Sequence, residues 1–219
     1  MKDFARSDDP AVQAQLDRLA ALSVPDGRLG LETIRALLAR LGDPQDRLPP
    51  VFHVAGTNGK GSTCANLRAM LEADGKRVHV ATSPHLVRYN ERIRIAGTLI
   101  EDAQLAALLA EVLDAGEDLN PSFFEVTIAA TFLAFARTPA DACVIEVGLG
   151  GLDLLLVLDQ GLDRIIKRFR ADRCGIGKRN GNSGRDSSEV IFFSQAPHEF
   201  AKFHYFMSSR FCVLKASRP

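Results

Sequence analysis

The residues with the clearest chemical signature follow an apolar stretch that begins at Val51. They are seven consecutive polar or small residues, Gly56, Thr57, Asn58, Gly59, Lys60, Gly61 and Ser62. Glycines let backbone N–H groups converge on phosphate oxygens, a lysine adds a positive charge, and a helix N-terminus contributes its partial positive end. The order of strand, glycine turn, lysine and helix therefore predicts a loop that binds nucleotide phosphates. A plain glycine-rich turn with a solvated lysine is the alternative.

A second chemical candidate is Glu146, which lies inside the apolar run Cys143-Val-Ile-Glu-Val147. A carboxylate in such a run is too costly to bury without a cationic partner. At the carboxyl end of a strand beside a phosphate loop, that partner would be Mg²⁺ bound to the nucleotide. The competing interpretation is a structural ion pair with an arginine. Ser83 ends another apolar run, where Ser-Pro also begins ordinary turns.

The elements that must position these residues alternate between apolar strands and amphipathic helices. The pattern predicts helices near residues 10–23, 31–41, 60–74, 101–115 and 122–136, and strands near 51–55, 77–82 and 142–147. A helix between two apolar strands is a βαβ unit, which implies a parallel sheet with ligands at the carboxyl ends of its strands. We therefore expect an α/β fold with a three-layer parallel sheet of the P-loop type. Residues 83–97 are polar, and we expect a functional loop there.

Four segments carry a more specific likeness, and they occur in a fixed order along the chain. They are His53-Val-Ala-Gly-Thr-Asn-Gly-Lys-Gly-Ser-Thr63, Thr82-Ser-Pro-His-Leu-Val-Arg-Tyr-Asn-Glu-Arg-Ile-Arg94, Phe123-Phe-Glu125 and Glu146-Val-Gly-Leu-Gly-Gly151. In these segments the sequence resembles the folylpolyglutamate synthase and dihydrofolate synthase family, relatives of the Mur peptide ligases. The resemblance extends to about residue 151.

The resemblance implies an activity and a set of site residues. The activity would be ATP-dependent ligation of L-glutamate to dihydropteroate or to a folate through an acyl phosphate, with ATP as co-substrate and Mg²⁺ as cofactor. The resemblance assigns catalytic roles to Lys60 and Glu146, and it makes Ser83 and Glu146 metal ligands. The substrate side would include Asp26, Gly27, Arg28, Leu29, Gly30, Phe124 and Glu125. From the residues alone, 26–30 would be an ordinary turn between helices and Phe124 a core residue.

The overall charge and the cysteines point to no special class of partner. The chain has 27 basic and 27 acidic residues, so no overall charge draws it to nucleic acid or to a membrane. The four cysteines, Cys64, Cys143, Cys174 and Cys212, show no paired spacing typical of zinc sites or disulfide frameworks. No apolar N-terminal run resembles a targeting segment. We expect a cytoplasmic monomer with buried or free thiols.

The character of the sequence changes after residue 151. Residues 1–151 hold 15 basic and 20 acidic side chains, whereas residues 152–219 hold 12 and 7. The family continues after its paired glycines with an arginine and then Leu-Asp-Ala-Thr-Asn, but here Leu152-Asp153 follows at once and nothing later matches. We therefore divide the chain into a P-loop ligase part, 1–151, and an unmatched basic tail, 152–219. A reading-frame change, a defective copy and a lineage-specific extension would each produce such a tail.

This boundary affects the expected function. We find no counterpart of the family's histidine at the second Mg²⁺ site, of its modified lysine, or of its carboxy-terminal domain, so we expect impaired ligation. The alternatives are a non-catalytic nucleotide-binding remnant and a nucleic-acid or protein-binding appendage on a P-loop fragment. The turn-forming residues 175–188 predict a mobile linker.

Overall fold

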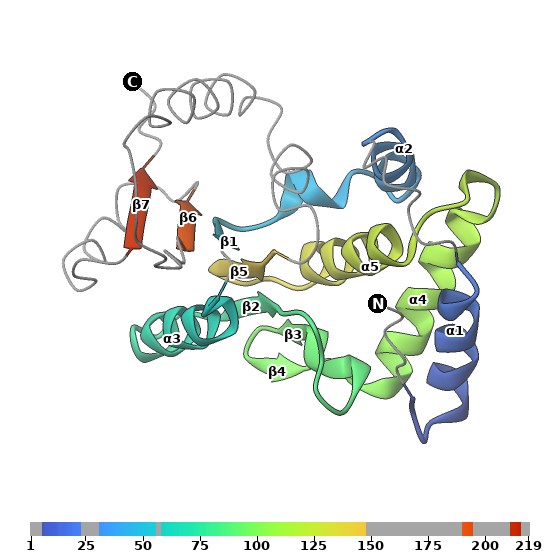
Figure 1. Ribbon diagram of the computed structural model, residues 1–219, viewed down its shortest axis with the longest axis horizontal. Coiled ribbons are helices and arrows are strands. Elements are labelled where there is room, and N and C mark those ends of the chain that lie inside the picture. Colours follow the sequence, from blue (N-terminus) through green and yellow to red (C-terminus); the bar gives the residue numbers. More distant parts are fainter. Residues whose placement is uncertain (1–5, 23–30, 56–57, 148–189, 195–210, 216–219) are drawn as a thin grey trace, which may run out of the picture.

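A computed structural model describes residues 6–22, 31–55, 58–147, 190–194 and 211–215 of the chain. Helices lie on both faces of a central sheet, so the predicted α/β fold is confirmed (Figure 1). Within these residues no helix has the length and apolar character needed to cross a membrane.

The centre of the sheet consists of three parallel strands. They are β1 (Val51–Ala55), β2 (Val78–Ala81) and β5 (Ala142–Glu146), with β5 between the other two. The complete order is β4-β3-β2-β5-β1-β6-β7. Because β1, β2 and β5 run in the same direction, the segments that follow them emerge at one edge of the sheet.

The outer strands make the sheet mixed. Next to β2 lies β3 (Ile93–Ile95), which is antiparallel to it, followed by the short antiparallel β4 (Thr98–Leu99). On the other side β6 (Val190–Ser194) is antiparallel to β1 and parallel to β7 (Phe211–Lys215). The predicted parallel sheet thus forms the middle of a larger mixed sheet.

The two faces of the sheet are covered by different helices. Helix α3 (Lys60–Ala73) packs on one face against Phe52, Val54, Val80 and Val144. The opposite face carries Val51, Cys143 and Ile145, which belong to a larger core with the remaining helices. These helices are α1 (Pro10–Ala20), α2 (Glu32–Arg40), α4 (Asp102–Ala115) and α5 (Phe123–Arg137). The alternation of side chains along each strand accounts for the two separate cores.

Helix ends agree closely with the sequence signals. Asp9 caps α1 by accepting hydrogen bonds from the N–H groups of Ala11 and Val12, both at 2.9 Å. Gly75, just beyond α3, has a φ of +76°, a conformation that glycine adopts without strain. All five predicted helices and the three predicted strands are present, with boundaries that shift by a few residues.

One prediction was wrong, because residues 83–97 are not a loop throughout. Tyr89–Arg92 form a short 3-10 helix, and β3 follows at once. Ile93 and Ile95 are buried while Arg94 between them is partly exposed, which is the two-residue alternation of a strand. The alternation covers only three residues, so the polar residues around it obscured the signal.

The division at residue 151 stays a prediction. Strands β6 and β7 come from the segment after that residue and extend the same sheet as β1. The linker predicted at 175–188 and the substrate segment predicted at 26–30 lie outside the described residues.

Candidate functional site

Helix α3 begins at the predicted phosphate loop. Gly59 precedes it with a φ of +78°, and Lys60 is its first residue. No side chain caps this end of the 14-residue helix, and Gly61 and Ser62 in its first turn are exposed. The first N–H groups of a helix have no partner within the helix and carry its partial positive charge. Such an end suits an anion, and Lys60 adds a full positive charge to it.

Two polar residues meet at the neighbouring strand ends. Glu146 is the last residue of β5, and its Oε2 accepts a hydrogen bond of 3.3 Å from the main-chain N–H of Ser83, two residues beyond β2. The register of β2 and β5 explains this meeting, because Ala81 pairs with Ile145. The sheet therefore brings Ser83 and Glu146 together at the edge where β1 leads toward α3.

Glu146 also lies close to the first turn of α3. A Cβ atom placed on Gly61 would stand 3.8 Å from Oε2 of Glu146. Burial raises the pKa of Glu146, while the Ser83 N–H and the positive charge of Lys60 act in the opposite direction. Burial raises the pKa of the nearby Cys64 thiol to about 12, with a further upward contribution from the Glu146 charge. Glu146 is thus a partly buried carboxylate beside the first turn of α3, and the charge of Lys60 acts on it.

This arrangement fits a nucleotide-bound Mg²⁺. The chain would supply the carboxylate of Glu146 and the hydroxyl of Ser83, and phosphate oxygens and water would complete the coordination, as Mg²⁺ prefers. The described part of the chain contains no group of three or more His, Cys, Asp or Glu side chains able to enclose a metal by themselves. The residues present therefore suit a metal that arrives with phosphate.

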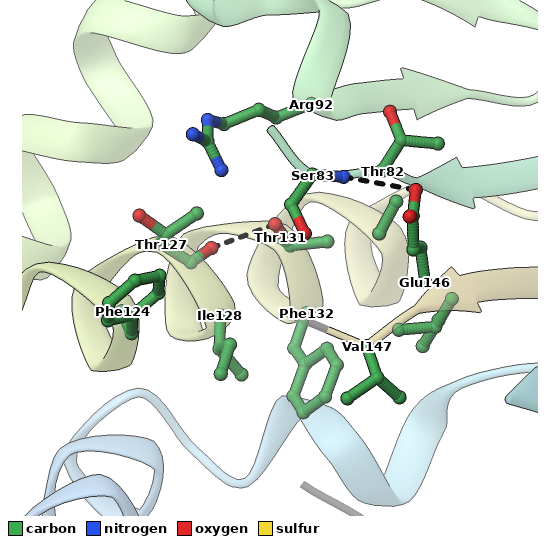
Figure 2. Close-up of a pocket in the computed structure, with 12 residues that line it drawn as sticks. Thr82, Ser83, Arg92, Phe124, Thr127, Ile128, Thr131, Phe132, Glu146 and Val147 are labelled. Atoms are coloured by element: carbon green, nitrogen blue, oxygen red, sulfur yellow. Dashed lines mark hydrogen bonds between the residues drawn. The ribbon is translucent and has the colours of Figure 1, made fainter. Parts of the chain in front are cut away.

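A pocket adjoins this edge of the sheet (Figure 2). Its volume is about 60 Å³, and one end holds Ser83 and Glu146. One side of α5 forms a wall, with the hydroxyls of Thr127 and Thr131 among apolar groups. The full lining comprises Ala81, Thr82, Ser83, Arg92, Phe124, Thr127, Ile128, Thr131, Phe132, Ile145, Glu146 and Val147. The sequence predicted three of these residues as site residues: Ser83, Phe124 and Glu146.

The most informative residue that sequence reasoning missed is Arg92. It is 3% exposed and lines the pocket. Its Nε donates a hydrogen bond of 2.9 Å to Nδ1 of His85, and its guanidinium carbon lies 5.3 Å from the ring centre of Tyr89 and 5.6 Å from that of Phe123. Burial lowers its pKa to about 10, so it stays cationic at neutral pH. The signal was the cluster of arginines around Tyr89, but spacing does not reveal which arginine turns inward.

The other arginines of this segment have different surroundings. Arg88 is exposed and binds the carboxylate of Asp102 through two hydrogen bonds of 2.9 and 2.8 Å. Arg94 donates to the carbonyl of Gly97 at 2.7 Å. Of the three, only Arg92 is among the residues that line the pocket.

The side chains of Phe124 and Glu125, both predicted to contact substrate, have different surroundings in the structure. Phe124 lines the pocket, whereas Glu125 binds Ser122 at the start of α5. Its Oε2 accepts 2.7 Å bonds from both the N–H and the hydroxyl of Ser122, and the Glu125 N–H donates back to that hydroxyl. This is a capping box, which gives Glu125 a structural role. Gly56, Thr57 and residues 26–30 lie outside the described residues.

His85 and His53 differ in their surroundings. Nδ1 of His85 accepts the hydrogen bond from Nε of Arg92. His53 is 1% exposed, and neither of its ring nitrogens has a hydrogen-bond partner among the described residues. Burial lowers its pKa to about 3. His53 is therefore a neutral side chain within the core.

Comparison with known proteins gives a consistent result. No protein-family profile matches the sequence. The chain is 37% identical over 171 residues to the dihydrofolate synthase/folylpolyglutamate synthase of Escherichia coli strain K12. This match covers 77% of the present chain and 40% of the E. coli enzyme. The chain thus spans well under half the length of this relative.

Solved structures agree with the sequence match. A structure described as E. coli FolC in complex with DHPP and ADP has a TM-score of 0.60 and 38% identity, and the match covers 68% of this chain and 35% of that one. A bifunctional folylpolyglutamate synthase/dihydrofolate synthase with Mn, AMPPNP and L-glutamate bound has a TM-score of 0.62 and 39% identity. The match covers 68% of this chain and 36% of that one.

Proposed function

Over 77% of its length this chain is a homologue of the folylpolyglutamate and dihydrofolate synthases. We therefore propose that it binds Mg-ATP and forms the nucleotide-binding part of an acid–amino-acid ligase. The substrates of that ligase would be dihydropteroate or a folate, together with L-glutamate. The relatives support this assignment, since one was solved with DHPP and ADP and another with Mn, AMPPNP and L-glutamate.

The proposal depends on one observation, which is that three neighbouring parallel strands bring Lys60, Ser83 and Glu146 to one edge of the sheet. Lys60 follows β1, Ser83 follows β2 and Glu146 ends β5. We assign Lys60 and the start of α3 to the ATP phosphates, with Gly56, Thr57, Asn58, Gly59, Gly61 and Ser62 as the rest of the loop. Ser83 and Glu146 hold the metal side of the nucleotide. Bound Mg²⁺ would offset negative charge on the phosphates during transfer.

The chemistry explains why such a site is needed. A carboxylate is a poor electrophile, so one of its oxygens first forms a bond to the γ-phosphorus while the bond to the β-phosphate oxygen breaks and ADP leaves. The amine of L-glutamate then attacks the acyl carbon, loses a proton and expels inorganic phosphate, which leaves an amide. In the first step Lys60 stabilises charge that develops on the transferred phosphoryl group.

Nucleotide binding without ligation is the second candidate function. The described residues offer one carboxylate and one hydroxyl for a metal, and no larger group of ligands. Ligation also requires that the acyl acceptor and the amine be held together in a defined geometry, and positioning supplies several kcal/mol of barrier reduction. For the 219-residue chain we therefore expect Mg-ATP binding and slow ATP hydrolysis, with little amide formation.

The test measures ADP release and folate products with the purified 219-residue protein. Reactions contain Mg-ATP with or without L-glutamate, and with dihydropteroate or tetrahydrofolate. ADP release that does not depend on glutamate is the expected result. Glutamate-dependent product would show that the chain is a complete ligase and would contradict the second candidate. Absence of any Mg-ATP binding by calorimetry would contradict the proposal itself.

A further inference from the structure

The segment that carries Ser83 is a loop whose two ends are tied together. At its base, the N–H of Thr82 donates to the carbonyl of Arg92 at 3.1 Å, and the Thr82 hydroxyl donates to the carbonyl of Glu91 at 3.0 Å. The N–H of Ser83 is bound to Oε2 of Glu146 (Figure 2). The base of the loop is therefore fixed where β2 ends and β3 begins.

The side chain of Glu91 fixes the other part of the loop. Its Oε2 accepts a hydrogen bond of 2.7 Å from the N–H of Leu86, and its Oε1 accepts bonds of 3.1 and 2.9 Å from the N–H groups of Val87 and Arg88. These bonds lower the pKa of Glu91, so the carboxylate stays ionised at neutral pH. One carboxylate thus holds three consecutive main-chain groups a short distance after Ser83.

We propose that Glu91 is a positioning residue for the metal, because through this loop it holds the hydroxyl of Ser83 beside Glu146. This inference rests on the proposed function, since the role of Ser83 at the metal comes from there. It gives Glu91 a part in binding Mg-ATP, although the Glu91 side chain is directed to its own loop and not to the nucleotide.

The metal makes the position of Ser83 important. Mg²⁺ requires nearly ideal octahedral geometry with short bonds to oxygen, so a displaced ligand binds it weakly. A loop that moves freely would present the Ser83 hydroxyl in many positions and would lose that freedom when the metal binds. A loop that is already ordered avoids this loss.

Apolar packing does not order the part of the loop that Glu91 holds. The side chains of Leu86 and Val87 are 90% and 78% exposed, so their burial contributes little to its stability. Hydrogen bonds to an ionised carboxylate are stronger than those between neutral groups. The bonds to Glu91 are therefore the interactions that we expect to order this part of the loop.

Other attachments of the loop do not involve the Glu91 side chain. The guanidinium of Arg88 binds the carboxylate of Asp102, and the side-chain amide of Asn90 donates to the carbonyl of Ile100 at 3.0 Å and to Asp102 at 2.7 Å. These bonds join the loop to the start of α4. A substitution at Glu91 should leave them in place, so we expect the protein to remain folded.

The experiment is a double-mutant cycle on Glu91 and Ser83, with Mg-ATP affinity measured by calorimetry on the 219-residue protein. Glu91→Gln keeps the size of the side chain but replaces one oxygen with an NH₂ group, which cannot accept from an N–H. We expect about tenfold weaker binding of Mg-ATP and unchanged binding of ATP in the presence of a chelator. Ser83→Ala should give a similar loss. Adding Glu91→Gln to Ser83→Ala should change the affinity by less than about twofold, because the hydroxyl is already absent.

The cycle separates positioning from a simple effect of charge. Removal of a negative charge near a metal would weaken Mg-ATP binding whether or not Ser83 is present. An equal effect of Glu91→Gln in the wild-type and Ser83→Ala backgrounds would therefore overturn the inference. Glu101→Gln, which removes an exposed carboxylate outside the loop, is the matched control and should bind Mg-ATP like the wild type.

A second variant tests the same loop from its base. Thr82→Val keeps the shape of the side chain and removes the hydroxyl that donates to the Glu91 carbonyl. It should weaken Mg-ATP binding to a smaller extent, again only when Ser83 is present. This variant decides the question if Glu91→Gln proves to be unfolded by circular dichroism.

Hydrogen exchange of the amides of Leu86, Val87 and Arg88 reports on the loop itself, and it should be faster in Glu91→Gln than in the wild type. If exchange is faster but Mg-ATP affinity is unchanged, the positioning role is wrong and the proposed function still stands. Unchanged exchange, or unchanged affinity in Ser83→Ala, would also overturn the inference. If the wild type binds no Mg-ATP, the proposed function and the inference both fail. A loss of affinity that appears only when Ser83 is present supports the inference.

Discussion

The main-chain N–H of Ser83 and Oε2 of Glu146 are 3.3 Å apart, although 63 residues separate them in the sequence. This bond joins the segment that follows β2 to the end of β5, the strand beside it. It leaves the hydroxyl of Ser83 and the second oxygen of Glu146 available for a further ligand. This hydrogen bond explains how two residues that the sequence marks only weakly as functional come to lie in one site.

The first prediction concerns the charge of Glu146. Glu146→Gln keeps the shape of the side chain and an oxygen that accepts the Ser83 N–H, but it removes the negative charge that faces Lys60. We expect about tenfold weaker binding of Mg-ATP, whereas the affinity for ATP in the presence of a chelator changes little. Isothermal calorimetry with and without Mg²⁺ measures both values.

Glu72→Gln is the matched control for this change, because Glu72 is an exposed carboxylate on the same helix, α3. Its Mg-ATP affinity should equal that of the wild type. Equal losses in both variants would mean that net charge matters and that Glu146 has no specific place at the metal.

The second prediction compares two glycines at the start of α3. Gly59 has a φ of +78°, so Gly59→Ala should lower the free energy of unfolding by about 1–2 kcal/mol. Gly61 lies within the helix, and an added Cβ would meet its nearest neighbour, Oε2 of Glu146, at an ordinary 3.8 Å. Gly61→Ala should therefore stabilise the protein by about 0.5–1 kcal/mol. Urea unfolding measures both effects, and equal effects of the two changes would contradict the conformation at Gly59.

The third prediction uses the buried His53. Its pKa in the folded protein is about 3, below the ordinary value near 6.5, so folding favours the neutral ring. The contribution of the neutral His53 ring to the free energy of unfolding is fully present above pH 6.5 and is lost as the pH falls toward 3. Between pH 7.5 and 5.0 this loss amounts to about 2 kcal/mol.

His53→Leu isolates this effect, because the apolar side chain has no proton to gain. The variant should lose about 2 kcal/mol less stability than the wild type between the two pH values, as measured by urea unfolding. His79, whose pKa burial also lowers, is present in both proteins and does not affect the comparison. Identical losses would show that the ring of His53 reaches solvent or a partner.

Several features could be predicted from the sequence because their signals are local. The apolar run 51–55, the glycines and Lys60 are adjacent in the chain, and their order determines both the βαβ unit and the start of α3. The capping box at Ser122 was also visible, since Ser-x-x-Glu before an apolar run marks a helix start.

The position of Arg92 against the pocket could not be predicted in this way. Its position depends on Tyr89, Phe123 and the wall of α5, which the fold assembles from separate parts of the chain. Spacing alone does not separate it from Arg88, which binds Asp102 at the surface. Such a distinction requires tertiary contacts.

The most direct test of the central claim is calorimetric titration of the wild type and of Lys60→Ala with Mg-ATP. The control is Lys76→Ala, which lies three residues beyond the far end of α3. We predict that the wild type and Lys76→Ala bind with the same affinity, whereas Lys60→Ala binds at least about 100-fold more weakly and keeps its circular dichroism spectrum. Unchanged Mg-ATP affinity in folded Lys60→Ala protein would contradict the assignment of this helix start to the nucleotide phosphates.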